Sequence, residues 1–251
     1  MIDLAQAARS FGVCLTPEQV TAFHRYRDEL LRWNRRFNLT AVEKPEAVEI
    51  RHFLDSLSLV IALRQLPDPI GLAWSTAETP EVSASAIDVG TGAGFPGLPL
   101  KLVWPELRLT LLEAVLKKVT FLRHVVELLG LSNVEAVPAR AEELGHDPCY
   151  RESYDLVLAR AVAPFPVLLE YTLPFCRVGG WFLAQKGPGV YQEMRHIQRA
   201  LVLLGGAVRE VLPVDVPFLD EKRTIVVIEK ITPTAVAYPR RPGIPAKRPL
   251  I

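Results

Sequence analysis

The sequence lacks any hydrophobic run long enough to cross a membrane. Its apolar stretches, such as Leu109 to Leu112 and Ile225 to Ile228, fall far short of the roughly 20 residues that a membrane-spanning helix needs. The N-terminus also lacks the basic segment, apolar stretch and small-residue cleavage site of a secretory signal. We therefore expect a cytoplasmic protein with no membrane partner.

The sequence also has few cysteines and almost no net charge. Cys14, Cys149 and Cys176 are odd in number, widely spaced and without a CxxC pair, so the pattern argues against a disulfide framework, a zinc site or any other metal site. The formal net charge is only +1. Affinity for nucleic acid would then require local clusters of basic residues, and such clusters occur near both ends of the chain.

Apolar residues are plentiful. The chain has 251 residues, of which 49% are hydrophobic and 23% charged, which is enough for one sizeable core or a main domain with an appendage. We expect three regions: residues 1–80 as an N-terminal helical subdomain and linker, 81–235 as the main domain, and 236–251 as a tail.

The first region has helical periodicity. Thr16-Pro17-Glu18 predicts a helix start, and the helix should run to about Phe37, with apolar residues at steps of three and four: Val20, Phe23, Tyr26, Leu30, Trp33 and Phe37. A second helix is expected from Glu46 to about Leu66, with Val48, Phe53, Leu57 and Ile61 facing inward. Residues 67–85, rich in Pro, Ser, Thr and Ala, should form a linker.

From Ala86 onward, short apolar runs alternate with helical stretches, the pattern of a parallel α/β sheet covered on both faces. Helices should include 116–129 and 189–204. The segment from Pro213 to Lys222 is too short for a crossover helix, so the last two strands should form an antiparallel hairpin. The tail, with Arg240, Arg241, Lys247 and Arg248, should be an extended basic arm rather than core. The strands are expected at 86–89, 107–112, 134–137, 156–159, 181–185, 208–214 and 224–229.

The strongest local signal is the glycine loop of residues 87–97, in which a strand runs directly into a turn and then a helix. Glycines allow a sharp turn and a close approach to a ligand, so a nucleotide-containing cofactor is expected there. The run also fits the GxGxxG dinucleotide pattern, which is weak alone. Pro96 and Pro99 each remove an N–H from the helix terminus that would hold a pyrophosphate.

Two acidic residues follow the next strands. Glu113 lies where a carboxylate can accept hydrogen bonds from both hydroxyls of a cofactor ribose. Glu142 lies where an adenine ring would rest, beside the small residues Ala139 and Ala141. Glu113 suits NAD and S-adenosylmethionine equally, but the terminal hairpin favours S-adenosylmethionine. The alternative is that the glycine loop binds no ligand and that Glu113 and Glu142 are ordinary surface carboxylates.

The sequence after the fourth strand restricts the methyl acceptor. It is Ala159-Arg160-Ala161-Val162-Ala163-Pro164 and lacks the Asn/Asp-Pro-Pro-aromatic element usual for methylation of exocyclic amines. Methylation of a pyrimidine carbon needs a thiolate nucleophile, and Cys149 lies at the wrong end of that strand. A ring nitrogen with a lone pair, such as guanine N7, needs only positioning and electrostatics.

Several motifs, in this order and spacing, resemble one family over nearly the whole chain. They are Asn34–Thr40 (NRRFNLT), Arg51–Leu57 (RHFLDSL), Asp88–Pro99, Lys117-Lys118 with Phe121-Leu122, Ala139–Glu143 (ARAEE), Arg160-Ala161 and Lys186-Gly187. The resemblance is to the bacterial small-subunit ribosomal RNA guanine-N7 methyltransferases, RsmG, formerly called glucose-inhibited division protein B. The tail from Tyr238 to Pro245 resembles the extended form of this family.

The resemblance implies a Rossmann-like S-adenosylmethionine-dependent methyltransferase fold, and a monomer that methylates guanine N7 in 16S rRNA, on the RNA or on the small ribosomal subunit. No catalytic base or nucleophile is implied. The family's cofactor positions fall on Gly90, Gly92, Phe95, Glu113, Ala114, Val115, Ala141, Glu142 and Arg160. Its RNA-side positions fall on Asn38, His52, Arg140, Lys186 and Arg223.

Two other functions remain open. One is a non-catalytic RNA-binding or ribosome-assembly protein on a methyltransferase fold, against which the intact loop and Glu113 argue. The other is an NAD-dependent dehydrogenase, but the sequence has no catalytic Tyr-x-x-x-Lys pair and no convincing His–Asp arrangement.

Overall fold

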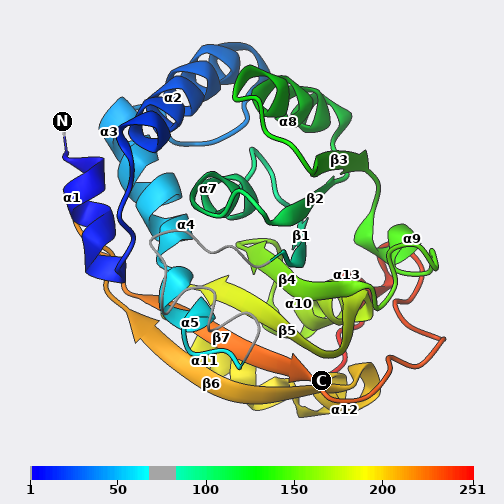
Figure 1. Cartoon of the computed structure of the whole chain (residues 1–251). Helices are drawn as coiled ribbons and strands as arrows, with labels where there is room; N and C mark the ends of the chain where they lie inside the picture. Colours follow the sequence, from blue (N-terminus) through cyan, green and yellow to red (C-terminus); the bar gives the residue numbers. More distant parts are fainter. Residues whose placement is uncertain (1, 68–82) are drawn as a thin grey trace.

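The computed structural model describes residues 2–67 and 83–251. Its centre is one seven-stranded sheet in the order β3-β2-β1-β4-β5-β7-β6 (Figure 1). The first five strands pair in parallel, and β7 pairs antiparallel to β5 and β6, which confirms the expected hairpin. The strands are β1 Ser85–Val89, β2 Arg108–Glu113, β3 Val134–Pro138, β4 Tyr154–Arg160, β5 Cys176–Lys186, β6 Gly206–Val214 and β7 Arg223–Lys230.

The sheet has a hydrophobic core on each face, because successive side chains of a strand point to opposite sides. In β1, Ala86 packs with the N-terminal helices, whereas Ile87 packs with the helices of the other face. The N-terminal helices therefore share a core with the sheet. On their side lie also α7 Gly97–Val103 and α8 Leu116–Leu128; the other side has α9 Ala141–Leu144, α10 Phe165–Thr172, α11 Val190–Glu193, α12 Gln198–Leu204 and α13 Ile244–Lys247.

The first long helix forms as its sequence predicts. Helix α2 spans Pro17–Phe37, and Thr16 closes a capping box with Gln19. Its buried stripe includes Phe23, Tyr26 and Leu30. This helix lies beside α8 across the top of Figure 1, and it follows the short helix α1 Leu4–Ala8.

The second predicted helix is interrupted. Residues 45–63 form α3 Pro45–Val48, a π-helical segment Glu49–Leu54 (η2), α4 Asp55–Leu57 and α5 Val60–Leu63. Phe53 and Leu57 are buried as expected, while Ile61 is only half-buried. π-helical turns occur often at functional sites, and this one contains His52. Most of the predicted linker, residues 68–82, lies outside the described residues.

The predicted helix 189–204 is also divided. A 3₁₀ turn at Met194–His196 separates α11 from α12, and α12 ends at Gly205 in the left-handed conformation. Further 3₁₀ turns occupy Arg9–Phe11 and Leu173–Phe175.

The expectation of an extended C-terminal arm is wrong. Leu250 is only 5% exposed and belongs to the core on the α10 side of the sheet. Arg240 forms an ion pair with the fully buried Glu170 of α10. The tail folds back because a buried carboxylate requires a cationic partner, and composition alone does not reveal that partner.

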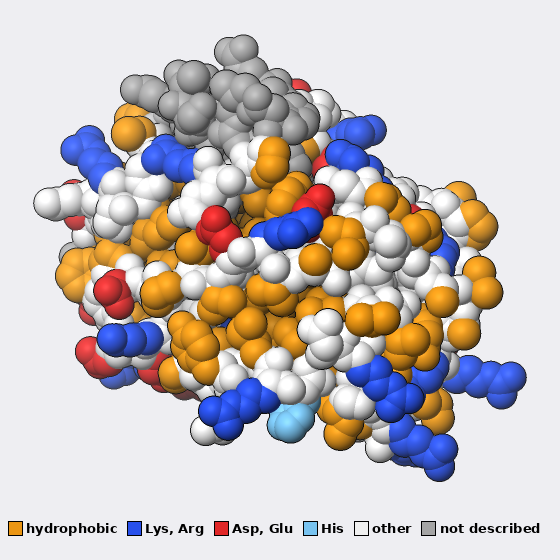
Figure 2. Space-filling view, turned by 90° about the horizontal axis from the view of Figure 1, so that it is seen from below, with side chains coloured by type: hydrophobic (Ala, Val, Ile, Leu, Met, Phe, Trp, Pro, Cys, Tyr) orange, Lys and Arg blue, Asp and Glu red, His pale blue; other side chains and the backbone are white. Residues whose placement is uncertain are grey.

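Within the described part of the chain, no helix is long and apolar enough to span a membrane. The face seen from below in Figure 2 gathers many hydrophobic side chains, with basic groups around its rim. A groove between α12 and β6, lined by residues such as Leu201, Val202 and Ile231, measures about 620 Å³.

Candidate functional site

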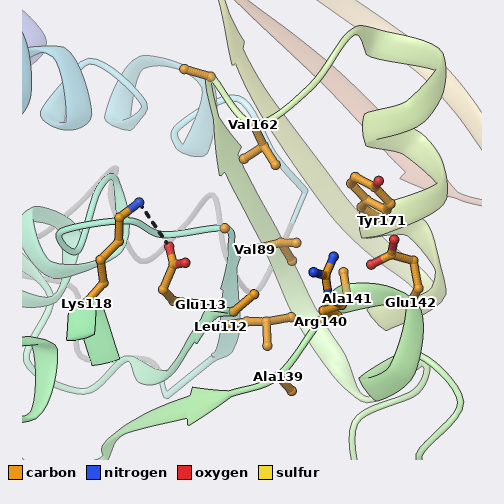
Figure 3. A pocket seen from close by; sticks show the side chains of 13 residues that line it. Val89, Leu112, Glu113, Lys118, Ala139, Arg140, Ala141, Glu142, Val162 and Tyr171 are labelled. Carbon is orange, nitrogen blue, oxygen red and sulfur yellow. Dashed lines mark ion pairs between the residues drawn. The ribbon is translucent and has the colours of Figure 1, made fainter. Parts of the chain in front are cut away.

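A cleft opens at the carboxyl ends of β1, β2 and β3 (Figure 3). Its volume of about 340 Å³ lies within the range of small-molecule sites. Parallel α/β sheets bind ligands at this edge. We call this the cofactor cleft; its lining residues are Val89, Gly90, Leu112, Glu113, Ala114, Lys118, Ala139, Arg140, Ala141, Glu142, Ala161, Val162 and Tyr171.

Gly90 lines the cofactor cleft immediately after β1. Its φ of +69° is in the left-handed region, which costs a residue with a Cβ about 1 to 2 kcal/mol. A Cβ at this position would also lie 2.8 Å from Cγ2 of Val162. The position therefore requires glycine for both backbone and space.

Glu113, at the end of β2, is held firmly against the loop. Its Oε2 accepts a hydrogen bond from the Gly92 N–H at 3.0 Å, and its Oε1 accepts one from the Val115 N–H at 2.8 Å. Lys118 Nζ lies 3.7 Å from Oε2, the ion pair drawn in Figure 3. A carboxylate has about four acceptor positions, so this fixed group retains capacity to accept ligand hydroxyls.

Asp88 lies under the glycine loop and forms a hydrogen bond with the first residue of α7. Its Oδ2 accepts hydrogen bonds from the Thr91 hydroxyl at 2.6 Å and the Gly97 N–H at 2.8 Å, while Oδ1 has no partner. Burial raises the pKa of Asp88 to about 6. The N–H that opens α7 is thus already used by an acidic side chain, which is unfavourable for a pyrophosphate at that terminus.

The opposite wall of the cofactor cleft comes from α9 and α10. Glu142, 6% exposed, accepts a hydrogen bond from the Gly243 N–H at 3.1 Å. Tyr171 lies beside Glu142 in Figure 3, and its burial, together with the Glu142 charge, raises the pKa of the phenol. Ala139 and Ala141 leave space for a flat ring between these polar groups.

A second group of polar residues centres on Asp55, which is buried in α4. Its Oδ2 accepts a hydrogen bond from Arg160 at 3.0 Å, and its Oδ1 accepts one from Arg223 at 3.1 Å. Gln185 donates to the same Oδ1 at 3.0 Å. Arg223 also pairs with Glu221 at 2.9 Å, so the two guanidinium groups are balanced by two carboxylates. We call Asp55, His52, Arg160, Gln185 and Arg223 the Asp55 cluster.

His52 is the aromatic member of the Asp55 cluster. It stacks on Phe95 with 4.4 Å between ring centroids. Nδ1 lies 3.1 Å from an Arg160 nitrogen and Nε2 lies 2.8 Å from the Thr40 hydroxyl, so His52 does not pair with a carboxylate. Burial, followed by the Arg160 charge, lowers the pKa of His52 to about 3, and the ring is therefore neutral.

The structure brings together five of the residues predicted to contact the cofactor. Gly90, Glu113, Ala114, Ala141 and Glu142 all line the cofactor cleft. The other four do not line it: Gly92 and Val115 use their N–H groups to hold Glu113, Phe95 packs against Tyr26 and His52, and Arg160 joins the Asp55 cluster.

The residues predicted to contact RNA are dispersed. His52 and Arg223 are in the Asp55 cluster, whereas Arg140 lines the cofactor cleft. Asn38 is exposed and caps α2 with φ +49°. Lys186 pairs with Glu193 at 2.8 Å and lies over the Phe165 ring.

Sequence reasoning did not select Asp55, Gln185, Lys118, Val162 or Tyr171. Asp55 lies inside the RHFLDSL motif and Lys118 inside the Lys117-Lys118 pair, so both had a local signal. Gln185, Val162 and Tyr171 carry none, because only the fold places them at the site. Among the residues that the structure describes, no group of three or more His, Cys, Asp or Glu is placed to hold a metal ion.

Comparison with known proteins gives the family. Residues 19–225 match the GidB model, described as rRNA small subunit methyltransferase G. Ribosomal RNA small subunit methyltransferase G of Roseiflexus castenholzii (strain DSM 13941 / HLO8) is 48% identical over 251 residues, 100% of both chains. The protein of that name from Acetivibrio thermocellus is 44% identical over 98% of this chain and 95% of its own.

Among solved structures, TrmN from Thermus thermophilus has a TM-score of 0.50 and 20% identity, covering 73% of this chain and 53% of its own. At this identity the likeness extends to the fold alone. The sequence match, by contrast, spans most of the chain and includes the residues of the cofactor cleft and the Asp55 cluster. The chain belongs to the rRNA small subunit methyltransferase G family.

Proposed function

We propose that this chain transfers a methyl group from S-adenosylmethionine to N7 of a guanine in small-subunit ribosomal RNA. Family membership supports the reaction class. The Glu113 carboxylate, fixed in the cofactor cleft by two backbone N–H groups, fits the ribose of a nucleotide-containing cofactor. The use of the α7 terminus by Asp88 argues against a dinucleotide.

The residues of the cofactor cleft fit S-adenosylmethionine. Glu113 would accept hydrogen bonds from the ribose hydroxyls, and the wall formed by Ala139, Ala141 and Glu142 would hold the adenine. Gly90 keeps the cleft open beside Val162. When bound, S-adenosylmethionine supplies a sulfonium-activated methyl group that a nitrogen lone pair accepts without prior loss of a proton.

The Asp55 cluster would orient the acceptor. Asp55 fixes Arg160 and Arg223 in one arrangement, so their guanidinium groups lose little further freedom when RNA binds. The neutral, half-buried His52 ring stacks on the buried Phe95 ring, and a flat aromatic ring is a usual support for an unstacked RNA base. The work left to the protein is therefore positioning.

The positions of the cysteines argue against methylation of a pyrimidine carbon. Cys149 lies with Ser85 and Arg108 at the amino ends of the strands, opposite the cofactor cleft. Burial raises the pKa of the Cys176 thiol to about 12, which disfavours the thiolate needed to methylate a pyrimidine carbon. Cys14 precedes α2 and is exposed. None of the three lines the cofactor cleft.

Basic side chains near both sites would bind the RNA backbone. Arg35 and Arg36 are exposed in the last turn of α2, close in sequence to Asn38, and Lys117 and Arg140 are exposed beside the cofactor cleft. Phosphate contacts of this kind release counterions, so binding should weaken steeply with salt. We propose that the protein acts in the cytoplasm on the small ribosomal subunit or its RNA.

The direct test uses purified protein and small ribosomal subunits from cells that lack the gene. We expect one N7-methylguanosine per subunit after incubation with S-adenosylmethionine, detected by mass spectrometry of the RNA nucleosides. Omission of protein is the first control, and NAD in place of S-adenosylmethionine is the second. Unmodified guanine, on both assembled subunits and naked RNA, would refute the proposal.

A further inference from the structure

The C-terminal tail contacts the cofactor cleft from outside the region that the family model matches. That match ends at residue 225, whereas the tail turns back between Tyr238 and Leu250 to pack beside α9 and α10 (Figure 1). Its Gly243 N–H reaches the Glu142 carboxylate, which lines the cofactor cleft.

The tail contacts the residues that follow α9 at three more places. The Pro239 carbonyl lies 2.6 Å from His146 Nε2. Arg151 donates from Nη1 to both the Gly145 and Tyr238 carbonyls, each at 2.8 Å. The Pro239 ring fits against Gly145, where a Cβ would lie 2.9 Å from its Cγ. These contacts join the end of α9 to the tail.

Arg240 fastens the tail to α10. Its Nε donates to Glu170 Oε1 at 2.9 Å and its Nη2 donates to Oε2 at 2.6 Å, a two-point pairing. The Arg240 backbone N–H donates to the same carboxylate at 2.8 Å. Glu170 is fully buried and immediately precedes Tyr171, which lines the cofactor cleft.

Helix α9 is too short to be stable without tertiary contacts. It has only four residues, Ala141–Leu144, and an isolated helix of one turn is unstable because nucleation is costly. The wall formed by Ala139, Ala141 and Glu142 therefore depends on tertiary contacts, and the tail supplies the contact to Glu142 and one to His146 just after α9.

We propose that the tail, residues 238–250, is a positioning element for S-adenosylmethionine, with Arg240 and Gly243 as its positioning residues. It fixes Glu142 through the Gly243 N–H and anchors α10 through the Arg240–Glu170 pair. This inference rests on the proposed function. By linkage, the effect is reciprocal: bound S-adenosylmethionine stabilises the docked tail to the same degree.

The test compares full-length Arg240→Ala, Arg240→Lys and Arg241→Ala. Arg241 is the matched control, because it is exposed, adjacent and equally charged, and the structure gives its side chain no ion pair within the described ranges. Isothermal titration should show S-adenosylmethionine affinity reduced about tenfold by Arg240→Ala, less by Arg240→Lys and within twofold of wild type by Arg241→Ala.

Kinetics separate positioning from general damage. At saturating S-adenosylmethionine, the kcat of Arg240→Ala and its KM for small subunits should stay near wild type, while its KM for S-adenosylmethionine rises about tenfold. Hydrogen exchange of residues 238–250 should be faster in Arg240→Ala than in wild type. In wild type, added S-adenosylmethionine should slow that exchange.

A second variant keeps the test decisive. Gly243→Pro removes the N–H that Glu142 accepts, and proline cannot adopt the φ of +81° found there. Faster tail exchange with unchanged S-adenosylmethionine affinity in either variant would overturn the inference, as would no response of tail exchange to S-adenosylmethionine in wild type. Failure of wild type to bind S-adenosylmethionine would instead refute the proposed function.

Discussion

The cofactor cleft and the Asp55 cluster are built from the chain in different ways. In the cofactor cleft, Gly90 follows β1, Glu113 ends β2 and Glu142 lies in α9, just after β3, so the parallel pairing of three neighbouring strands brings them to one edge. In the Asp55 cluster, the carboxylate reaches Arg223 across 168 positions of sequence. The first site thus depends mainly on backbone conformation, and the second on buried charge. Substitutions in the cofactor cleft should therefore mainly lower S-adenosylmethionine affinity, whereas substitutions in the Asp55 cluster should mainly lower stability and kcat.

The largest expected effect is on the cofactor cleft. Gly90→Val should lower S-adenosylmethionine affinity about a thousandfold or more, about 4 kcal/mol, because its side chain collides with Val162. Isothermal titration measures this. Gly130→Val is the control, since Gly130 has a similar φ of +62° but no atom within 4 Å of a Cβ. Equal S-adenosylmethionine affinities of the two variants would show that Gly90 is not part of the cofactor site.

The next effect is on the Asp55 cluster. Asp55→Asn leaves Arg160 and Arg223 without their shared carboxylate and should lower the free energy of unfolding by about 3 kcal/mol. The kcat on small subunits should fall about a hundredfold, with S-adenosylmethionine affinity within twofold of wild type.

Asp155→Asn is the matched control for Asp55. Asp155 also pairs with an arginine, Arg177, at 2.7 Å, but it lies at the amino end of β4, away from the site. Its variant should lose stability and retain kcat. If both variants lose kcat equally, the Asp55 cluster has no specific part in the reaction.

Acid should weaken the Asp55 cluster through His52. The pKa of His52 falls from 6.5 to about 3 on folding, so between these values the unfolded chain binds more protons and stability falls as pH falls. Relative to His52→Gln, wild type should lose about 2 kcal/mol of unfolding free energy between pH 7 and pH 5. Urea titrations at several pH values measure the difference. Parallel pH profiles would mean that His52 titrates normally.

The smallest effect concerns Arg140, which lines the cofactor cleft although the family resemblance assigns it to RNA. Arg140→Ala should weaken RNA binding about tenfold and reduce the salt slope by about one, with S-adenosylmethionine affinity changed less than threefold. Arg108→Ala, exposed at the amino end of β2, should leave both unchanged. A larger loss of S-adenosylmethionine affinity than of RNA affinity would assign Arg140 to the cofactor instead.

Local patterns predicted the sheet well. All seven strands and α2 lie close to their expected positions along the chain, and the antiparallel hairpin forms as expected, because alternation, caps and glycine turns act over a few residues. The same patterns missed the π-helical turn at Glu49–Leu54 and the break before α12. Phe95 and Arg160, which the family resemblance assigns to the cofactor, lie against His52.

The sequence by itself determined where the strands lie along the chain, the glycine turn after β1 and the acidic residues near the ends of the next two strands. It did so because each depends on backbone conformation within a short segment. Only the tertiary structure decided that Asp55 joins Arg160 to Arg223 and that the tail folds back onto Glu142. Burying a charge is favourable only with a partner at hand, and that partner lies far away in the chain.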